Sequence, residues 1–207
     1  MKKLLLILLI MLVAPAGLCL AADPDIRLPH TDGSDAPSGR ITWPPQRFAD
    51  NGNGTVSDNL TGLMWMREAN CIDTYDLTVG SNIRLTGMVT WAEALSFAQM
   101  VNSGAVRCGV TTTYTDWRVP NRREIWSLTD FSLGSTGGTS SSLPAGHPFI
   151  NDESIYWSST VYSGPAIFDI IGDPLPPAAW VYNLHDPYLL PEDRTDYHFV
   201  WLCRGGN

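Results

Sequence analysis

The chain has 207 residues, of which 44% are hydrophobic and 16% charged, and its formal net charge is −8. This composition predicts a folded domain and excludes an intrinsically disordered chain. The chain has 13 basic and 21 acidic residues. Its surface would therefore repel polyanions, and we expect no nucleic-acid partner.

The first 22 residues have the three parts of a cleavable signal peptide. Two lysines precede an apolar run at residues 4–13, and two alanines follow at 21–22. The run is too short for a transmembrane helix. We therefore expect an exported chain that keeps no transmembrane segment, located in the periplasm, at the cell surface or outside the cell. Lipidation of Cys19 is the alternative.

Cleavage after this signal peptide would also remove both lysines. The remaining 185 residues would carry 11 arginines against the 21 acidic residues, a net charge of −10. Residues 23–44 are rich in Pro, Gly, Ser and Asp without apolar periodicity, which predicts a linker. Residues 45–207 are then long enough for one domain with a sizeable core.

The stretch DNGNGTVSDNLTGLMW, residues 50–65, allows two interpretations. As a calcium loop of the EF-hand type with Gly54 at its sixth position, it would have Ala49 first and Leu60 twelfth, so two essential ligands are missing. As a turn, its glycines tolerate positive φ angles, and the runs TVS and LMWM form the two strands of a hairpin. We favour the turn and predict no bound metal or cofactor. A looser calcium site is the alternative, with ligands Asn51, Asn53 and Asp58.

Two helices are predicted from capping boxes. In TWAEALSFAQMVNSG, Thr90 is the N-cap, Glu93 follows three residues later, and Gly104 ends the helix. Its expected apolar face consists of Trp91, Ala94, Leu95, Ala98 and Val101. In DWRVPNRREIWSLTDF, residues 116–131, Asn121 and Glu124 have the same spacing and predict a shorter helix.

The charged residues around this second helix could belong to a catalytic site or to the framework. Paired carboxylates are able to do acid–base work. We favour a structural role, in which Arg118 pairs with acidic neighbours and fixes the helix to the sheet. The set consists of Asp116, Arg118, Arg123 and Glu124.

Three later runs are enriched in Val, Tyr, Trp and Phe and predict strands at residues 156–161, 178–184 and 198–204. The long connections between them, residues 162–177 and 185–197, are the expected ligand-binding loops. Aromatic rings stack on sugars and aspartates accept hydrogen bonds from hydroxyl groups. The candidate ligand-binding residues are Tyr162, Phe168, Asp169, Tyr182, His185, Asp186, Tyr188 and Tyr197.

Three cysteines follow the signal peptide: Cys71, Cys108 and Cys203. In an oxidising compartment they predict one disulfide and one free thiol, and spacing alone allows all three pairings. The free thiol could link two copies of the chain, so a homo-oligomer is possible.

The ordered sequence blocks resemble a known family over residues 44–207, the Lcl C-terminal domain. The blocks are RFADNGNGTVSDNLTGLMW, TWAEAL, SGAVRCG, DWRVPNRREIWSLTDFS, LPAGHPF, YWSST, AWVYNL and VWLCRGG. The family is mostly bacterial and exported, and was formerly classed as a domain of unknown function. Its name comes from the end domain of a collagen-like surface adhesin that binds sulfated glycans.

The resemblance implies an α+β fold that is remotely C-type-lectin-like, with two helices, a twisted antiparallel sheet and long loops. It also implies a Cys71–Cys108 disulfide and leaves Cys203 as the free thiol. Two features depart from the family. Asn53 stands where members commonly have Asp, and the chain is acidic where the adhesin depends on basic surface.

Together these features predict a non-catalytic, adhesin-like recognition domain for a glycan or a protein ligand. The sequence contains neither HExxH nor GxSxG. One alternative is a structural component of the cell envelope. Another is an enzyme distantly related to formylglycine-generating enzymes, which share the C-type-lectin-like fold.

Overall fold

The computed structural model describes residues 46–79, 87–131, 141–164 and 177–205. The predicted signal peptide and linker lie outside these residues and stay predictions. The elements are, in chain order, β1 (Phe48–Asp50), β2 (Thr55–Asp58), β3 (Leu63–Met66), α1 (Cys71–Thr74), α2 (Trp91–Asn102), α3 (Arg122–Trp126), β4 (Ile155–Val161), β5 (Ala178–Asn183), β6 (Tyr188–Asp193) and β7 (Cys203–Gly205).

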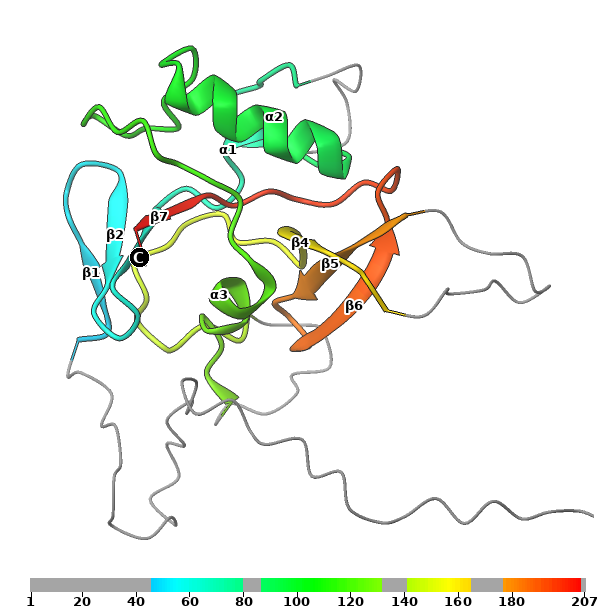
Figure 1. Cartoon of the computed structure of the whole chain (residues 1–207). Helices are drawn as coiled ribbons and strands as arrows, with labels where there is room; N and C mark the ends of the chain where they lie inside the picture. Colours follow the sequence, from blue (N-terminus) through cyan, green and yellow to red (C-terminus); the bar gives the residue numbers. More distant parts are fainter. Residues whose placement is uncertain (1–45, 80–86, 132–140, 165–176, 206–207) are drawn as a thin grey trace, which may run out of the picture.

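The first sheet has the order β1-β2-β3-β7, and all its pairs are antiparallel. The predicted hairpin is confirmed, with Val56 opposite Trp65 and both side chains buried. β7, near the end of the chain, pairs with β3, so the two ends of the described chain lie in one sheet (Figure 1).

The second sheet has the antiparallel order β4-β5-β6, and it corrects one prediction. β4 and β5 correspond to the predicted strands at 156–161 and 178–184. Residues 185–197, however, are not one long loop, because residues 188–193 form the strand β6, with a short turn before it and another after it. Pro191 obscured the strand in the sequence, but a proline is tolerated in β6 because β6 lies at the edge of the sheet.

The predicted strand at 198–204 is wrong for most of its length. Only residues from Cys203 onward form β7, while His198 and Phe199 make single bridges with Val89 and Tyr156. This segment runs from the second sheet to the first through the middle of the molecule (Figure 1). Its apolar residues therefore reflect burial on several sides rather than pairing along a ladder.

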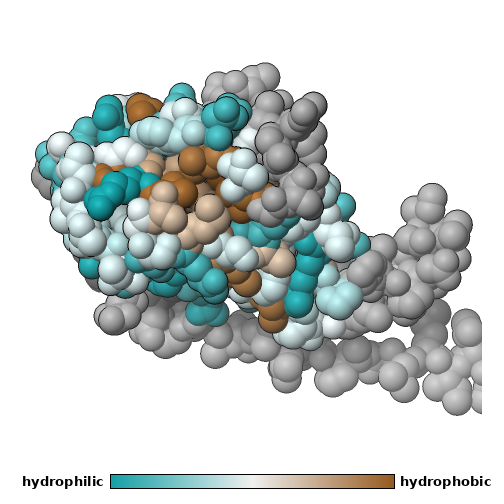
Figure 2. Space-filling model, turned by 90° about the horizontal axis from the view of Figure 1, so that it is seen from above, coloured by the Kyte–Doolittle hydropathy of each residue, from teal (hydrophilic) through white to brown (hydrophobic). Residues whose placement is uncertain are grey.

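Both predicted capping boxes are confirmed. Thr90 and Glu93 cap α2, and Asn121 and Glu124 cap α3. α2 buries Ala94, Phe97, Ala98 and Val101, whereas Trp91 and Leu95 are only partly buried. From above, the side that α2 occupies in Figure 1, apolar residues gather near the middle of an otherwise mixed face (Figure 2). The single turn α1 was not predicted.

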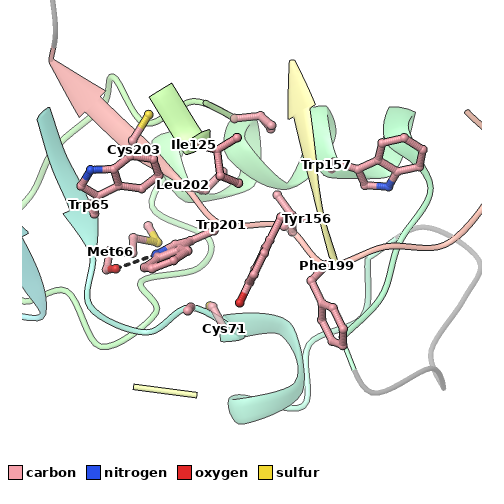
Figure 3. Packing of buried hydrophobic residues seen from close by; sticks show 14 of the residues in the cluster. Trp65, Met66, Cys71, Ile125, Tyr156, Trp157, Phe199, Trp201, Leu202 and Cys203 are labelled. Carbon is pink, nitrogen blue, oxygen red and sulfur yellow. Dashed lines mark hydrogen bonds between the residues drawn. The ribbon is translucent and has the colours of Figure 1, made fainter. Parts of the chain in front are cut away.

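The core joins the two sheets through buried aromatic residues. The Trp201 ring lies 5.4 Å from that of Trp65 in the first sheet and 5.6 Å from that of Tyr156 in the second. The Trp201 indole N–H donates to the Met66 carbonyl oxygen at 2.8 Å (Figure 3). The result is a mixed α+β domain with two antiparallel sheets and few, short helices.

Candidate functional site

A disulfide between Cys71 and Cys108 links the start of α1 to the loop after α2. It joins residues 37 apart in sequence and confirms the pairing that the family resemblance implied. Such a bond indicates an oxidising compartment. Within the described chain, none of the helices has the length and hydrophobicity of a membrane span.

The glycine-rich stretch before β2 is a turn. Gly52 and Gly54 have φ angles of +71° and +83°, in the region that favours glycine. The Asn51 side-chain amide donates to Thr55 Oγ1 at 2.9 Å, and that of Asn53 donates to Thr112 Oγ1 at 3.0 Å. The asparagines thus hold the turn to β2 and to the loop after α2.

Asp58, the third candidate calcium ligand, lies at the opposite end of β2. It is buried and accepts hydrogen bonds from the Arg47 guanidinium at 3.1 and 3.0 Å. Asn51, Asn53 and Asp58 therefore do not form one ligand set. Among the described residues, no group of three or more His, Cys, Asp or Glu side chains is arranged to hold a metal ion.

A cavity of about 250 Å³ opens beside the disulfide, and we call it the disulfide cleft. Four segments that are distant in sequence form it: the turn before β2, the end of β3, α1 and the loop after α2. The segment around residue 150 completes the wall. The lining residues are Gly52, Asn53, Gly54, Arg67, Glu68, Tyr75, Cys108, Gly109, Thr111 and Ile150.

Two large apolar side chains of the disulfide cleft are open to solvent. Tyr75 is 45% exposed and Ile150 is 39% exposed, although most large apolar residues of the described chain are buried. The Tyr75 hydroxyl group occupies the space that a side chain at position 109 would fill, so Gly109 allows the ring to lie over the loop. An exposed aromatic ring beside a cavity is a common feature of binding sites.

Polar groups surround these apolar side chains. Arg67 Nε lies 3.3 Å from Asp50 Oδ2 and donates to the Pro148 carbonyl oxygen at 3.1 Å. Glu68 is 4% exposed and accepts from the Asn70 backbone N–H at 3.1 Å. Its second oxygen accepts from Asn151 Nδ2 at 3.0 Å. The disulfide cleft therefore combines apolar contact surface with oriented hydrogen-bonding groups.

Those of the predicted ligand-binding residues that the structure describes do not meet at one site. His185, Asp186 and Tyr188 lie at the β5–β6 turn, where the Asn183 side chain accepts from the backbone N–H groups of 185 and 186. Tyr162 lies at the other end of β5, since its N–H donates to the Ala178 carbonyl oxygen. The two ends are separated by about 16 Å at ~3.3 Å per residue.

The other predicted residues divide in the same way. Tyr197 follows the end of β6, on the same side as Tyr162. Phe168 and Asp169 lie outside the described residues.

Tyr182 is a correction, because it belongs to the core and not to a binding surface. The side chain is fully buried, and its hydroxyl group is hydrogen-bonded to Thr129 Oγ1. Burial raises the pKa of Tyr182 above its ordinary value. It faces inward because its partner across the sheet, Tyr156, points into the same core.

Arg118 pairs with an acidic neighbour near α3, as we expected. Arg118 forms a two-point ion pair with Glu124 at 2.6 and 2.7 Å and donates to the Gly205 carbonyl oxygen at 2.8 Å. It thereby links α3 to β7. Asp116 accepts from Arg204 at 2.7 and 3.1 Å, which lowers the pKa of the Asp116 carboxyl.

Cys203 is the free thiol of the described chain, and it is buried. Burial raises its pKa to about 12, although the nearby Arg118 guanidinium acts in the opposite direction. A thiol in this environment is neither ionised nor accessible at neutral pH.

Sequence reasoning missed most of the disulfide cleft. The turn at residues 51–54 is recognisable in the sequence, but no local pattern connects it with Tyr75 or Ile150, which are 75 residues apart. The available signal was the disulfide, because pairing Cys71 with Cys108 brings α1 and its exposed tyrosine to the loop at Gly109.

A comparison with protein families identifies the class of this chain. The model of the Lcl C-terminal domain matches residues 54–204. The chain therefore belongs to the Lcl C-terminal domain family. A search of curated proteins found no match.

Proposed function

We propose that this chain is an exported, non-catalytic recognition domain that binds a glycan in the disulfide cleft. The observation that carries this proposal is the position of Tyr75 and Ile150, which stand exposed beside a cavity lined with hydrogen-bonding groups. The covalent link between two walls of the cavity supports it further, because a rigid site loses less entropy when a ligand binds.

The chemistry of the disulfide cleft suits a sugar. The exposed Tyr75 side chain offers a surface for a pyranose ring, while the Arg67 guanidinium and the second N–H of the Asn53 amide offer donors for hydroxyl groups. The volume of about 250 Å³ is slightly below the usual range of small-molecule sites, about 300–1,000 Å³, so the site suits a small ligand. One or two sugar rings at the end of a chain would fit such a site.

Export and an adhesin-like role complete the proposal. The disulfide, together with the predicted signal peptide, supports action at the cell envelope or outside the cell. We also infer that the two antiparallel sheets and the capped helix α2 are a remote version of the C-type-lectin-like fold, with the disulfide cleft as its binding face.

The alternatives receive less support. An envelope component linked through Cys203 would need an accessible thiol, and Cys203 is buried. An enzyme of the formylglycine-generating type would need reactive thiols. Two of the three cysteines after the predicted cleavage site are joined in the disulfide, and the pKa of Cys203 is raised to about 12.

The proposal is tested by screening the chain, without its signal peptide, against an array of envelope and host glycans. Tyr75→Ala should abolish binding to the best ligand. Tyr188→Ala is the matched control, since Tyr188 is 40% exposed but starts β6 in the other sheet. Binding that is lost with Tyr188→Ala and kept with Tyr75→Ala would refute the site. If the chain binds proteins in a parallel screen but no glycan of the array, the proposal of a glycan ligand is refuted.

A further inference from the structure

The charges around the disulfide cleft carry information about its ligand. Arg67 is the basic residue among those that line it, and its positive charge is matched by Asp50 at 3.3 Å. Arg107 is close in sequence to Cys108, but it lines a different cavity at the end of α2. Within the described chain, the cleft therefore offers no unmatched positive charge to an anion.

Glu68 is an acidic residue of the cleft whose negative charge is not matched by any basic side chain that the structure describes. It lines the cleft, it is 4% exposed, and no ion pair of the described residues includes it. Its hydrogen bonds come from neutral amides, the Asn70 backbone and the Asn151 side chain. A carboxylate has about four lone-pair positions, so two positions remain for a ligand.

The position of this carboxylate is fixed by two elements. Asn70 is the N-cap of α1, and Asn151 also donates to Thr74 Oγ1 at 3.2 Å on the same helix. Glu68 thus lies between α1 and the segment at residues 150–151, next to the exposed side chains of Tyr75 and Ile150. Two exposed aspartates, Asp73 and Asp76, flank Tyr75 and add negative potential.

From this charge distribution we propose that the disulfide cleft selects an amine-bearing sugar, such as an unacetylated hexosamine, over neutral and sulfated sugars. The inference rests on the proposed function. A protonated amine would form a charge-assisted hydrogen bond with Glu68, stronger than any that a neutral acetamido group could form. A sulfate group would meet an unmatched carboxylate and be repelled.

The experiment compares three probes by titration calorimetry at about 0.15 M salt: oligomers of glucosamine, oligomers of N-acetylglucosamine, and heparin oligosaccharides. We expect one site, with glucosamine oligomers bound about tenfold more tightly than the acetylated ones. Heparin oligosaccharides should not bind. This comparison uses the unaltered chain, so it does not depend on how any variant folds.

Two variants that each remove one negative charge locate the effect. Glu68→Gln should bring the ratio of the two affinities close to one. Asp73→Asn, on α1 but outside the lining of the cleft, should leave most of the preference intact. Thermal unfolding checks that both variants fold.

The outcomes separate this inference from the proposed function. Suppose that Tyr75→Ala abolishes binding, as the proposed function requires. Equal affinities for glucosamine and N-acetylglucosamine oligomers, or stronger binding of heparin oligosaccharides, would then overturn the amine selection alone. If none of these three probes binds while a glycan of the array binds and requires Tyr75, the amine selection fails and the proposed function stands. If Tyr75→Ala changes nothing, or if no glycan of the array binds, both proposals fail.

Discussion

Gly54 lies directly against Gly109, so the turn before β2 and the loop after α2 touch through two residues without side chains. A Cβ at Gly54 would stand 2.9 Å from Val110 Cα and closer still to the Gly109 carbonyl group. Thr111 N–H donates to the Asn53 carbonyl oxygen at 3.0 Å on the same contact. This contact and the disulfide fix two walls of the disulfide cleft relative to each other.

The contact predicts that Gly54→Ala is more harmful than the same change at Gly52. Both glycines have positive φ angles, but a Cβ at Gly52 has open space around it. We expect Gly52→Ala to lower the free energy of unfolding by about 1 kcal/mol from backbone strain. Gly54→Ala adds an overlap with backbone atoms and should lower it by about 2–4 kcal/mol. Chemical denaturation of both variants measures this, and equal losses would disprove the close contact.

The disulfide predicts a large contribution to stability. Closing a loop of this length contributes about 4 kcal/mol in the chain-entropy model. The double variant Cys71→Ser/Cys108→Ser should lose an amount of that order and should also lose ligand binding, because α1 is no longer held to the loop at Gly109. A denaturation midpoint unchanged from that of the oxidised chain would contradict this.

The sequence predicted best where the signals were local. The capping boxes of Thr90 and Asn121 each depend on a residue three positions away, and both helices formed as expected. The hairpin around residues 59–62 was predictable for the same reason. Contacts between residues that are distant in the sequence were not predictable from local patterns. The burial of Tyr182 depends on Thr129 and on β4, and none of these contacts is visible in its neighbourhood.

The candidate site was also not predictable from local sequence patterns. Tyr182 was a candidate ligand-binding residue within a predicted strand, but its side chain is buried, and Tyr188, expected in a loop, begins β6. The disulfide cleft is formed by residues from Gly52 to Ile150. Such a site is defined by tertiary contacts, so composition and periodicity could not reveal it.

Cys203 should be unreactive in the native protein. With a pKa of about 12, only ~10⁻⁴ of the thiol is ionised at pH 8. Labelling by a thiol reagent should therefore be about a thousandfold slower in the native than in the unfolded chain. The native chain should also migrate as a monomer on a non-reducing gel. Rapid native labelling, or a covalent dimer that Cys203→Ser removes, would show that the thiol is accessible.

Two histidines predict a pH dependence of stability. Burial lowers the pKa of His147 and of His198, although nearby aspartates act in the opposite direction. The unfolded chain then binds protons more readily than the native state as the pH falls through about 6.5. The free energy of unfolding should therefore decrease between pH 7.5 and 6.

Urea denaturation at the two pH values measures this decrease, and His198→Gln should make it smaller. His198 is a suitable position because its ring packs edge-on against that of Trp157 at 4.7 Å, inside the fold. A stability that rises as the pH is lowered, or an identical decrease in the variant, would contradict the assignment.

Backbone amide chemical shifts, recorded while the isotope-labelled chain is titrated with its best glycan ligand, would locate the binding site most directly. Binding in the disulfide cleft should shift the resonances of Asn53, Arg67, Tyr75 and Gly109 together, with one dissociation constant. Shifts confined to the β5–β6 turn at His185, Asp186 and Tyr188, with those of the disulfide cleft unchanged, would contradict it.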